Sequence, residues 1–221
     1  MSRIKQLKQG RLLYFSRAKD AISVYENAHL RWLNFEEVVQ TIIRKSTPHR
    51  LTLPHQWALM MPLLTHSPMS VTEFGLGAGS HLRFIQWLNP KIRHHVIEAS
   101  EEVIHIANTY FFSPTLKSCV THQEASHWLA SKGTLSDDWY IFDIYQPAEF
   151  LDNSYNHLLT ETINALEQGS FLSINFPDVT TKELSFWLQF VSSKASHQVR
   201  CYTTPHYNNT VLHLYPIKPN P

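Results

Sequence analysis

The chain of 221 residues lacks several features that would place a protein in a class at once. It has only two cysteines, Cys119 and Cys201, which excludes a disulfide framework and a pair of closely spaced metal-binding cysteines. Its apolar runs, such as FLSINF and WYIFDIY, are far too short to cross a bilayer. It also lacks an excess of either charge, because 19 basic and 18 acidic residues leave a net charge of +1. We therefore expect neither a nucleic-acid nor a membrane partner.

Histidine is abundant, and this raises the question of metal binding. The chain has 14 histidines, but they form no HExxH motif and no pair four residues apart on a predicted helix. The closely spaced ones are His49, His55, His94, His95, His122 and His127. We interpret them as core or surface residues and predict no metal site. Hydrophobic residues make up 43% of the chain, as in an ordinary protein that buries a core.

The N-terminal region is basic and is predicted to form a small unit of its own. Six basic residues precede the first acid, Asp20, which is typical of a transit peptide, a phosphate-binding arm or a solvated terminus. The sequences RLLYF and AISVYE predict a β-hairpin, and apolar residues at helical spacing predict a helix over 33–45. We assign this hairpin and helix to residues 1–48. No apolar segment follows the basic residues, so we expect no secretory signal and a cytoplasmic protein.

Strands alternate with helices through most of the remaining chain, residues 49–221. Five predicted strands lie in VTEF, HHVIEAS, KSCVTHQEA, WYIFDIYQP and FLSINFP, with helical patterns between them. Two more, QVRCY and VLHLYPI, have no helix between them and predict a C-terminal antiparallel hairpin. This order predicts an α/β fold with a mainly parallel seven-stranded sheet.

The turn after the first strand of this sheet carries Gly75, Gly77 and Gly79, followed by a helix. Glycines at such a turn let a ligand approach the backbone closely, and Glu98, 19 residues further on, is placed to accept the hydroxyls of a ribose. Ser80 stands where a dinucleotide-binding fingerprint has its last glycine. The spacing and the terminal hairpin favour a nucleoside with a short tail, such as S-adenosylmethionine. The alternative is a tightly packed turn without a ligand.

Two further acids follow strands of the predicted sheet. Glu124, with Ala125 beside it, follows the third strand, where a carboxylate could reach an adenine; the alternative is a solvated loop acid. Asp143 lies in the apolar strand YIFDIY, beside the point where open α/β sheets bind ligands. A carboxylate there is costly without a partner or a function, so Asp143 is either functional or a structural hydrogen-bond acceptor.

These segments together resemble the polyamine aminopropyltransferases, the spermidine and spermine synthases. The resemblance runs from about Leu30 to Tyr215 and is carried by EFGLGAGS, VIEASEEVIHIANTYF, QEASHWL, YIFDIYQP and TTPHYNNT. It implies a methyltransferase-like Rossmann fold after a small N-terminal domain, in a chain that forms a homodimer. It also implies transfer of an aminopropyl group from decarboxylated S-adenosylmethionine to a diamine in polyamine biosynthesis, with release of methylthioadenosine.

Individual residues take on roles through this resemblance. Glu98 matches the acid that binds the ribose, Glu124 and Ala125 match the adenine contacts, and Asp143 matches the carboxylate that deprotonates the attacking amine. Two glutamines that contact the nucleoside correspond to Gln40 and Gln56. The diamine site corresponds to Tyr207 and Gln146.

The chain departs from the family at the residues that would hold a diamine. An acid of the family's glycine loop is replaced by Ala78, a second acid by Gln146, and a tyrosine by His55. Losing an acid that pairs with a desolvated ammonium costs about 2–5 kcal/mol of binding. The nucleoside half is therefore retained and the polyamine half altered. We expect an aminopropyltransferase-like enzyme first, and an S-adenosylmethionine-dependent methyltransferase or a non-catalytic nucleoside-binding relative as alternatives.

Overall fold

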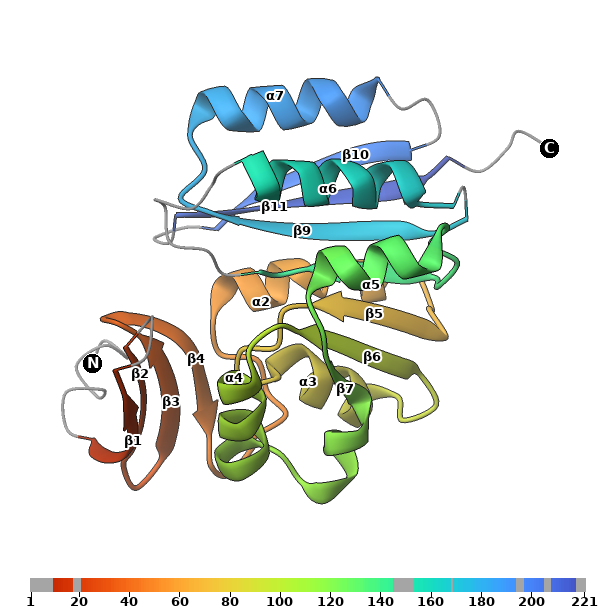
Figure 1. The fold of residues 1–221 in the computed structure, drawn as a ribbon. Helices are drawn as coiled ribbons and strands as arrows, with labels where there is room; N and C mark the ends of the chain where they lie inside the picture. The colour runs from red at the N-terminus through yellow and green to blue at the C-terminus, as the bar shows by residue number, and fades with distance from the viewer. Residues whose placement is uncertain are drawn as a thin grey trace.

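The structure is a computed structural model that describes residues 10–17, 21–144, 153–167, 169–193, 197–204 and 208–217. Two residues predicted for the diamine site, Gln146 and Tyr207, lie outside these ranges. Within them, the chain forms a four-stranded antiparallel sheet followed by a larger seven-stranded sheet. Figure 1 shows the smaller sheet standing at one side of the molecule.

The seven-stranded sheet has the order β10-β11-β9-β8-β5-β6-β7. Its strands are β5 (Ser70–Phe74), β6 (Arg93–Glu98), β7 (Val120–His122), β8 (Trp139–Phe142), β9 (Phe171–Pro177), β10 (His197–Thr203) and β11 (Asn209–Pro216). The five strands from β9 to β7 are parallel, whereas β10 and β11 pair antiparallel at one edge. The predicted mainly parallel sheet with a C-terminal hairpin is confirmed.

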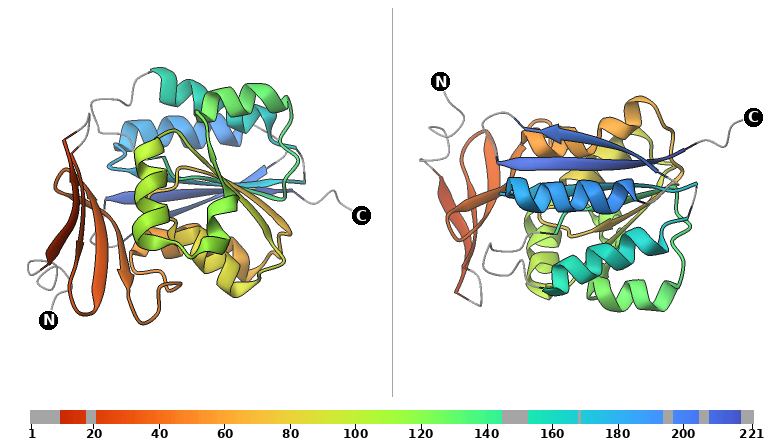
Figure 2. Two further views of the ribbon diagram at one scale, coloured as in Figure 1. Left: turned by 60° about the horizontal axis from the view of Figure 1, so that its bottom comes forward. Right: turned by 90° about the horizontal axis from the view of Figure 1, so that it is seen from above.

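Helices cover both faces of this sheet, as Figure 2 shows. On one face lie α2 (Pro54–Leu59), a 3-10 turn (Met61–Leu64) and α3 (Ser80–Leu88); on the other lie α5 (Ala125–Lys132), α6 (Asn153–Ala165) and α7 (Thr181–Ser192). A further helix, α4 (Glu101–Ile106), continues as a π-turn (Ala107–Phe111), and a 3-10 segment (Pro114–Cys119) precedes β7. Pro54 opens α2 and Pro62 follows its end, as the position of each proline predicts.

The N-terminal sheet corrects the prediction of a helix over 33–45. Four antiparallel strands are present, in the order β1 (Arg11–Ser16), β2 (Ile22–Glu26), β3 (Leu30–Phe35) and β4 (Val38–Arg44). Glu36 and Glu37 form the turn between β3 and β4, and Glu36 has a φ of 51°. The residues after the turn are largely β-branched valine, threonine and isoleucine, which favour a strand.

The two sheets share one apolar cluster. Val24 and Leu33 of the small sheet pack with Leu76 after β5 and with Val103 and Ile106 of α4. Near this cluster the hydroxyl of Tyr14 donates a hydrogen bond of 2.9 Å to the carboxylate of Glu102. The small sheet is thereby fixed beside the carboxyl ends of β5 and β6.

Only some of the tryptophans lie in the core. Trp128, Trp139 and Trp187 are buried, whereas Trp57 and Trp87 are 50% and 57% exposed. These two lie on the outer side of α2 and α3, where Trp87 stacks on His49. Among the described helices none is long and apolar enough to cross a membrane.

Candidate functional site

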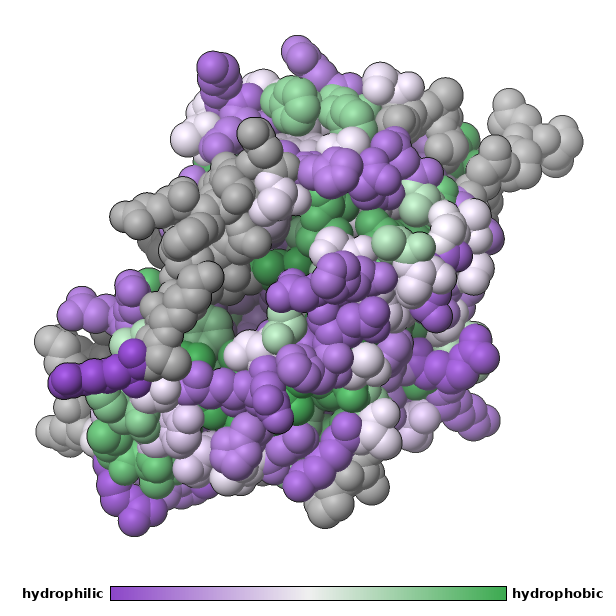
Figure 3. Space-filling view, viewed as in Figure 1, coloured by the Kyte–Doolittle hydropathy of each residue, from purple (hydrophilic) through white to green (hydrophobic). Residues whose placement is uncertain are grey.

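A cavity of about 950 Å³ lies where the small sheet meets the carboxyl ends of the parallel strands. In the space-filling view, the surface is hollowed beside the N-terminal sheet (Figure 3). Ligands of open α/β sheets bind at this edge, where the strand order changes direction. The cavity is lined by most of the residues predicted for a site, namely Gln40, Gln56, Gly75, Gly77, Glu98, Glu124, Ala125 and Asp143.

Glu98, the last residue of β6, is held by the backbone around it. One carboxylate oxygen accepts a hydrogen bond of 2.8 Å from the amide of Leu76, and the other accepts one of 2.8 Å from the amide of Ser100. Burial raises the pKa of Glu98, and these hydrogen bonds oppose that effect. Each oxygen keeps a second lone pair, so the fixed carboxylate can still accept two hydroxyl groups.

The three glycines of the turn serve different purposes. A Cβ on Gly75 would lie 2.3 Å from the backbone oxygen of Asp143, so this glycine lets the ends of β5 and β8 come together. A Cβ on Gly79 would lie 2.2 Å from the ring of Phe112, and Gly79 is not part of the cavity lining. Gly77 lines the cavity, and the nearest atom to a Cβ added there would be the Thr41 hydroxyl oxygen, at 3.7 Å. Packing thus accounts for Gly75 and Gly79, whereas Gly77 leaves room in the cavity.

The two glutamines reach the cavity from different elements. Gln56 is buried, and its side-chain oxygen accepts hydrogen bonds from the amides of Thr52 and Leu53, so this oxygen caps the start of α2. Gln40 comes from β4, and its buried Nε2 has no hydrogen-bond partner among the described residues. A buried amide without a partner is costly, so Gln40 is suited to donate to a ligand.

Glu124 and Ala125 lie at the start of α5 and line the same cavity. Ala125 is buried, and its small side chain takes up little of the cavity beside Glu124.

Asp143 follows β8 and is oriented by a chain of amide side chains. Its Oδ1 accepts a hydrogen bond of 2.8 Å from Asn175 of β9, whose own oxygen accepts one of 3.1 Å from Asn209 of β11. Its side chain is 24% exposed and lines the cavity. The carboxylate is therefore both fixed and accessible, as a base requires.

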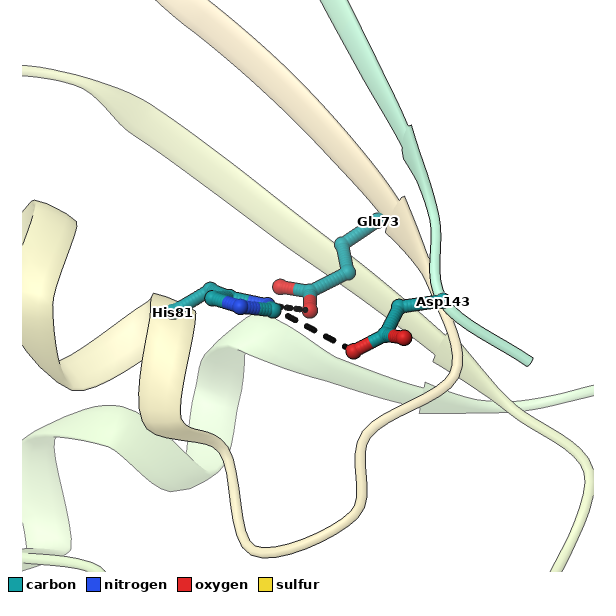
Figure 4. Close-up of side chains that lie close together, drawn as sticks. All are labelled: Glu73, His81 and Asp143. Carbon is teal, nitrogen blue, oxygen red and sulfur yellow. Dashed lines mark hydrogen bonds and ion pairs between the residues drawn. The ribbon is translucent and has the colours of Figure 1, made fainter. Parts of the chain in front are cut away.

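The sequence interpretation missed a cluster of buried titratable residues behind Asp143. Glu73, in the middle of β5, accepts hydrogen bonds of 2.7 Å from His81 Nδ1 and 3.0 Å from His94 Nε2. His81 also lies 3.9 Å from Asp143, as Figure 4 shows. The argument that singled out Asp143, an acid inside an apolar strand, applies equally to Glu73 in SVTEF and could have found it.

Glu73, His81 and Asp143 bring one ligand atom each within 4.8 Å of one another, the geometry of a possible metal site in the part of the chain that the structure describes. The separation of 2.7 Å between His81 and Glu73 fits a hydrogen bond. Two ligands bound to one zinc ion at about 2.0–2.2 Å in tetrahedral geometry would lie further apart. The contact therefore holds a proton, and the prediction of no metal site stays a prediction.

Arg83 of α3 fixes the glycine turn from inside. It is buried and donates hydrogen bonds to the backbone oxygen of Pro48 at 3.0 Å, to that of Ala78, and to the hydroxyl of Ser80 at 3.3 Å. Burial lowers the pKa of Arg83 to about 9, so the guanidinium remains charged at neutral pH. The sequence interpretation did not find this residue either, because two of its three partners are backbone oxygens.

Comparisons with known proteins agree with the resemblance seen in the sequence. No protein-family model matches the chain. Two polyamine aminopropyltransferases, from Neisseria meningitidis serogroup A and serogroup B, are each 30% identical over 96 residues, which is 42% of this chain. The chain covers 36% of the length of each of these curated relatives.

Solved structures extend the likeness to nearly the whole fold. A probable spermidine synthase from Corynebacterium glutamicum superposes with a TM-score of 0.73 at 15% identity, over 94% of this chain and 80% of that one. A spermidine synthase in complex with the transition-state analogue AdoDATO gives a TM-score of 0.62 at 16% identity, over 92% of this chain and 72% of that one. Human methyltransferase-like protein 13 in complex with SAH gives a TM-score of 0.56 at 18% identity, over 76% of this chain and 84% of that one. The predicted methyltransferase-like fold is confirmed, as is the resemblance to the aminopropyltransferases.

Proposed function

We propose that this chain, which resembles the polyamine aminopropyltransferases, is a transferase that binds an S-adenosylmethionine-type nucleoside. The donor proposed first is decarboxylated S-adenosylmethionine and the acceptor an amine, as in a spermidine synthase. Glu98 binds the ribose, Glu124 and Ala125 receive the adenine, and Gln40, Gln56 and Gly77 complete the wall. No metal takes part in the proposed reaction.

The observation that carries this proposal is the fixed carboxylate of Glu98 in the cavity wall. Its two oxygens are oriented by the amides of Leu76 and Ser100, and their remaining lone pairs suit a vicinal diol. The unpartnered Nε2 of Gln40 and the open side of Gly77, both in the lining of the same cavity, support the same ligand. The similar structures add support, since methyltransferase-like protein 13 was solved in complex with SAH and the spermidine synthase in complex with AdoDATO.

Asp143 is the proposed base of the transfer step. The acceptor nitrogen forms a bond to the aminopropyl carbon attached to the sulfonium. The carbon–sulfur bond breaks, its electron pair remains on the sulfur of methylthioadenosine, and the nitrogen's proton passes to the carboxylate. The hydrogen bond from Asn175 fixes this carboxylate in one orientation, which favours proton transfer over a short distance.

Calorimetry with methylthioadenosine and with decarboxylated S-adenosylmethionine tests nucleoside binding. Replacing the carboxylate in Glu98→Gln removes charge-assisted hydrogen bonds, so we expect the dissociation constant to rise about 10- to 100-fold. Glu101→Gln is the matched control, because Glu101 is exposed in the first turn of α4 and outside the cavity lining. Failure of the wild type to bind either nucleoside at millimolar concentration would reject the proposal.

Methyl transfer is the second candidate, and Ala78 favours it. This residue is fully buried where the aminopropyltransferase resemblance calls for an acid, so the turn over 75–80 has no carboxylate for an aminopropyl ammonium. Transfer of a tritiated methyl group from S-adenosylmethionine to candidate amines separates the two reactions. Turnover in either assay excludes a purely non-catalytic nucleoside-binding relative.

Several expectations from the sequence stay predictions. These are the homodimer, the cytoplasmic location, the absence of nucleic-acid and membrane partners, and the domain boundary between residues 48 and 49.

A further inference from the structure

Glu73 is a buried charge that needs a compensating proton. Its side chain is only 3% exposed, and both carboxylate oxygens accept hydrogen bonds from imidazoles, one from His81 and one from His94. Burial disfavours the charged carboxylate, but the two histidines more than offset this and lower the pKa of Glu73 to about 2. An ionised carboxylate at this depth is stable only beside a positive group.

His81 is the histidine of this cluster that also reaches the cavity. It lies in the first turn of α3, is 3% exposed and lines the cavity, and its Nδ1 faces Glu73 at 2.7 Å and Asp143 at 3.9 Å. Its other ring nitrogen, Nε2, is buried and has no hydrogen-bond partner among the described residues. A carboxylate that accepts from one imidazole nitrogen fixes the ring and its tautomer, which leaves the other nitrogen to exchange protons with a ligand.

The charges around His81 favour its protonated form. The groups that face it are Glu73 of β5, with His94 of β6 beyond it, Asp143 after β8, His55 of α2, and Arg83 of its own helix. Burial lowers the pKa of His81, but the two carboxylates outweigh burial and Arg83, and the net shift is upward. A base works best when its pKa lies near the operating pH, and a histidine whose pKa is raised from 6.5 meets this condition.

We propose that His81 is a second acid–base residue of the transfer site, oriented by Glu73, and that its Nε2 exchanges the proton of the acceptor. This inference deepens the proposed function and rests on it. An amine attacks only when neutral, so the first proton of the acceptor's ammonium passes to Nε2 of neutral His81. When the nitrogen then bonds to the donor carbon and the carbon–sulfur bond breaks towards sulfur, its second proton passes to Asp143, the base proposed above. The resulting imidazolium lies between Glu73 and Asp143, and it returns the proton to water as the products leave.

Nuclear magnetic resonance of the ¹⁵N-labelled full chain tests the charge and contact of His81 without any need for turnover. Loss of its ring signals in His81→Gln assigns them. We expect Nδ1 to stay protonated, the pKa to lie above 6.5, and the pKa to fall in Glu73→Gln. Addition of methylthioadenosine with 1,4-diaminobutane is expected to shift the Nε2 signal. An ordinary pKa that does not respond to Glu73→Gln, or an unchanged Nε2 signal, would overturn the inference.

The pH dependence of kcat gives the second readout. His81→Gln is expected to lose about 100-fold or more in kcat with little change in KM for the donor, because a general base contributes about 10²–10⁴-fold. Glu73→Gln is expected to move the acidic limb of the pH profile of kcat to lower pH. If this limb came from ionisation of the acceptor amine, the substitution would not move it. His105→Gln, at an exposed position of α4, is the control.

The two proposals fail in distinguishable ways. If His81→Gln and Glu73→Gln turn over with an unchanged kcat and an unchanged acidic limb of the pH profile, His81 has no role in the transfer. The proposed function then still stands. Absence of transfer by the wild type to any amine removes the proposed function, and the resonance data then decide on His81. If His81→Gln does not fold, His81→Asn takes its place, since its amide can still donate to Glu73.

Discussion

Gly75→Ala is expected to destabilise the chain strongly, because the added methyl group meets backbone. Gly75 has a φ of 93°, and its Cβ would lie 2.3 Å from the carbonyl oxygen and 2.9 Å from the carbonyl carbon of Asp143. Neither atom can rotate away, since the end of β8 is tied to β5 by the hydrogen bond from the Asp143 amide to the Phe74 oxygen at 2.9 Å. Relief of the clash therefore requires that the two strands move apart.

The size of the effect follows from two contributions. A non-glycine residue in the left-handed region costs about 1–2 kcal/mol, and overpacking a well-packed site adds about 1–3 kcal/mol. Their sum, roughly 2–5 kcal/mol, corresponds to a fall in Tm of roughly 4–20 °C for a chain of this size. Thermal unfolding followed by circular dichroism measures it.

Gly77→Ala is the matched comparison, because it carries the backbone cost without the clash. Gly77 has a φ of 51°, and its Cβ would make an ordinary contact of 3.7 Å with the Thr41 hydroxyl oxygen. We expect a loss of about 1–2 kcal/mol in stability, with weaker binding of methylthioadenosine since the methyl group enters the cavity. Equal Tm values for Gly75→Ala and Gly77→Ala would refute the reasoning that the close approach of β5 and β8 requires Gly75.

Three further predictions address the buried charges and the orientation of the base. Arg83→Lys is expected to lose about 2–4 kcal/mol in urea unfolding, because one ammonium cannot serve the carbonyl and hydroxyl acceptors of a guanidinium; exposed Arg93→Lys should change little. The lowered pKa of Glu73 contributes stability above pH 4.5 that is lost as the pH falls towards 2, so Glu73→Gln should lose less stability than the wild type across this range; the loss that remains comes from groups such as Glu26, whose pKa is also lowered to about 2. Asn175→Ala is expected to lower kcat about 10-fold, with the affinity for methylthioadenosine unchanged, because only the orientation of Asp143 is lost; an equal loss of nucleoside affinity in calorimetry would contradict this.

The order of elements in the large sheet could be predicted from the sequence because it depends on local patterns. Apolar strands bounded by turns, helical periodicity and the two closing strands without a helix between them specify an α/β fold with a terminal hairpin. Helical periodicity misled at 33–45, where apolar residues at helical spacing predicted a helix. The pairing of β4 with β3 and the β-branched residues of β4 decided the outcome instead.

The candidate site was predictable where its residues follow strand ends. Glu98, Glu124 and Asp143 each come after or at the end of a parallel strand, so the topology alone brings them to one edge of the sheet. His81 and Glu73 meet through a helix packed on a strand, and Asn175 meets Asp143 from the next strand. Such contacts depend on packing distances that no spacing in the sequence specifies.

The residues proposed to bind the donor follow strand ends and could be predicted from the sequence. The residues proposed to act on the acceptor meet through packing, and most of them could not. The part of the cavity proposed to bind the nucleoside is built from backbone amides and glycine geometry around Glu98. The part proposed to carry out the transfer depends on buried side chains from β5, α3 and β9 that orient Asp143 and His81. Substitutions in the second set can therefore alter the acceptor chemistry while the donor still binds. We accordingly expect variants of Asn175 and His81 to separate kcat from nucleoside affinity, whereas variants of Glu98 change affinity first.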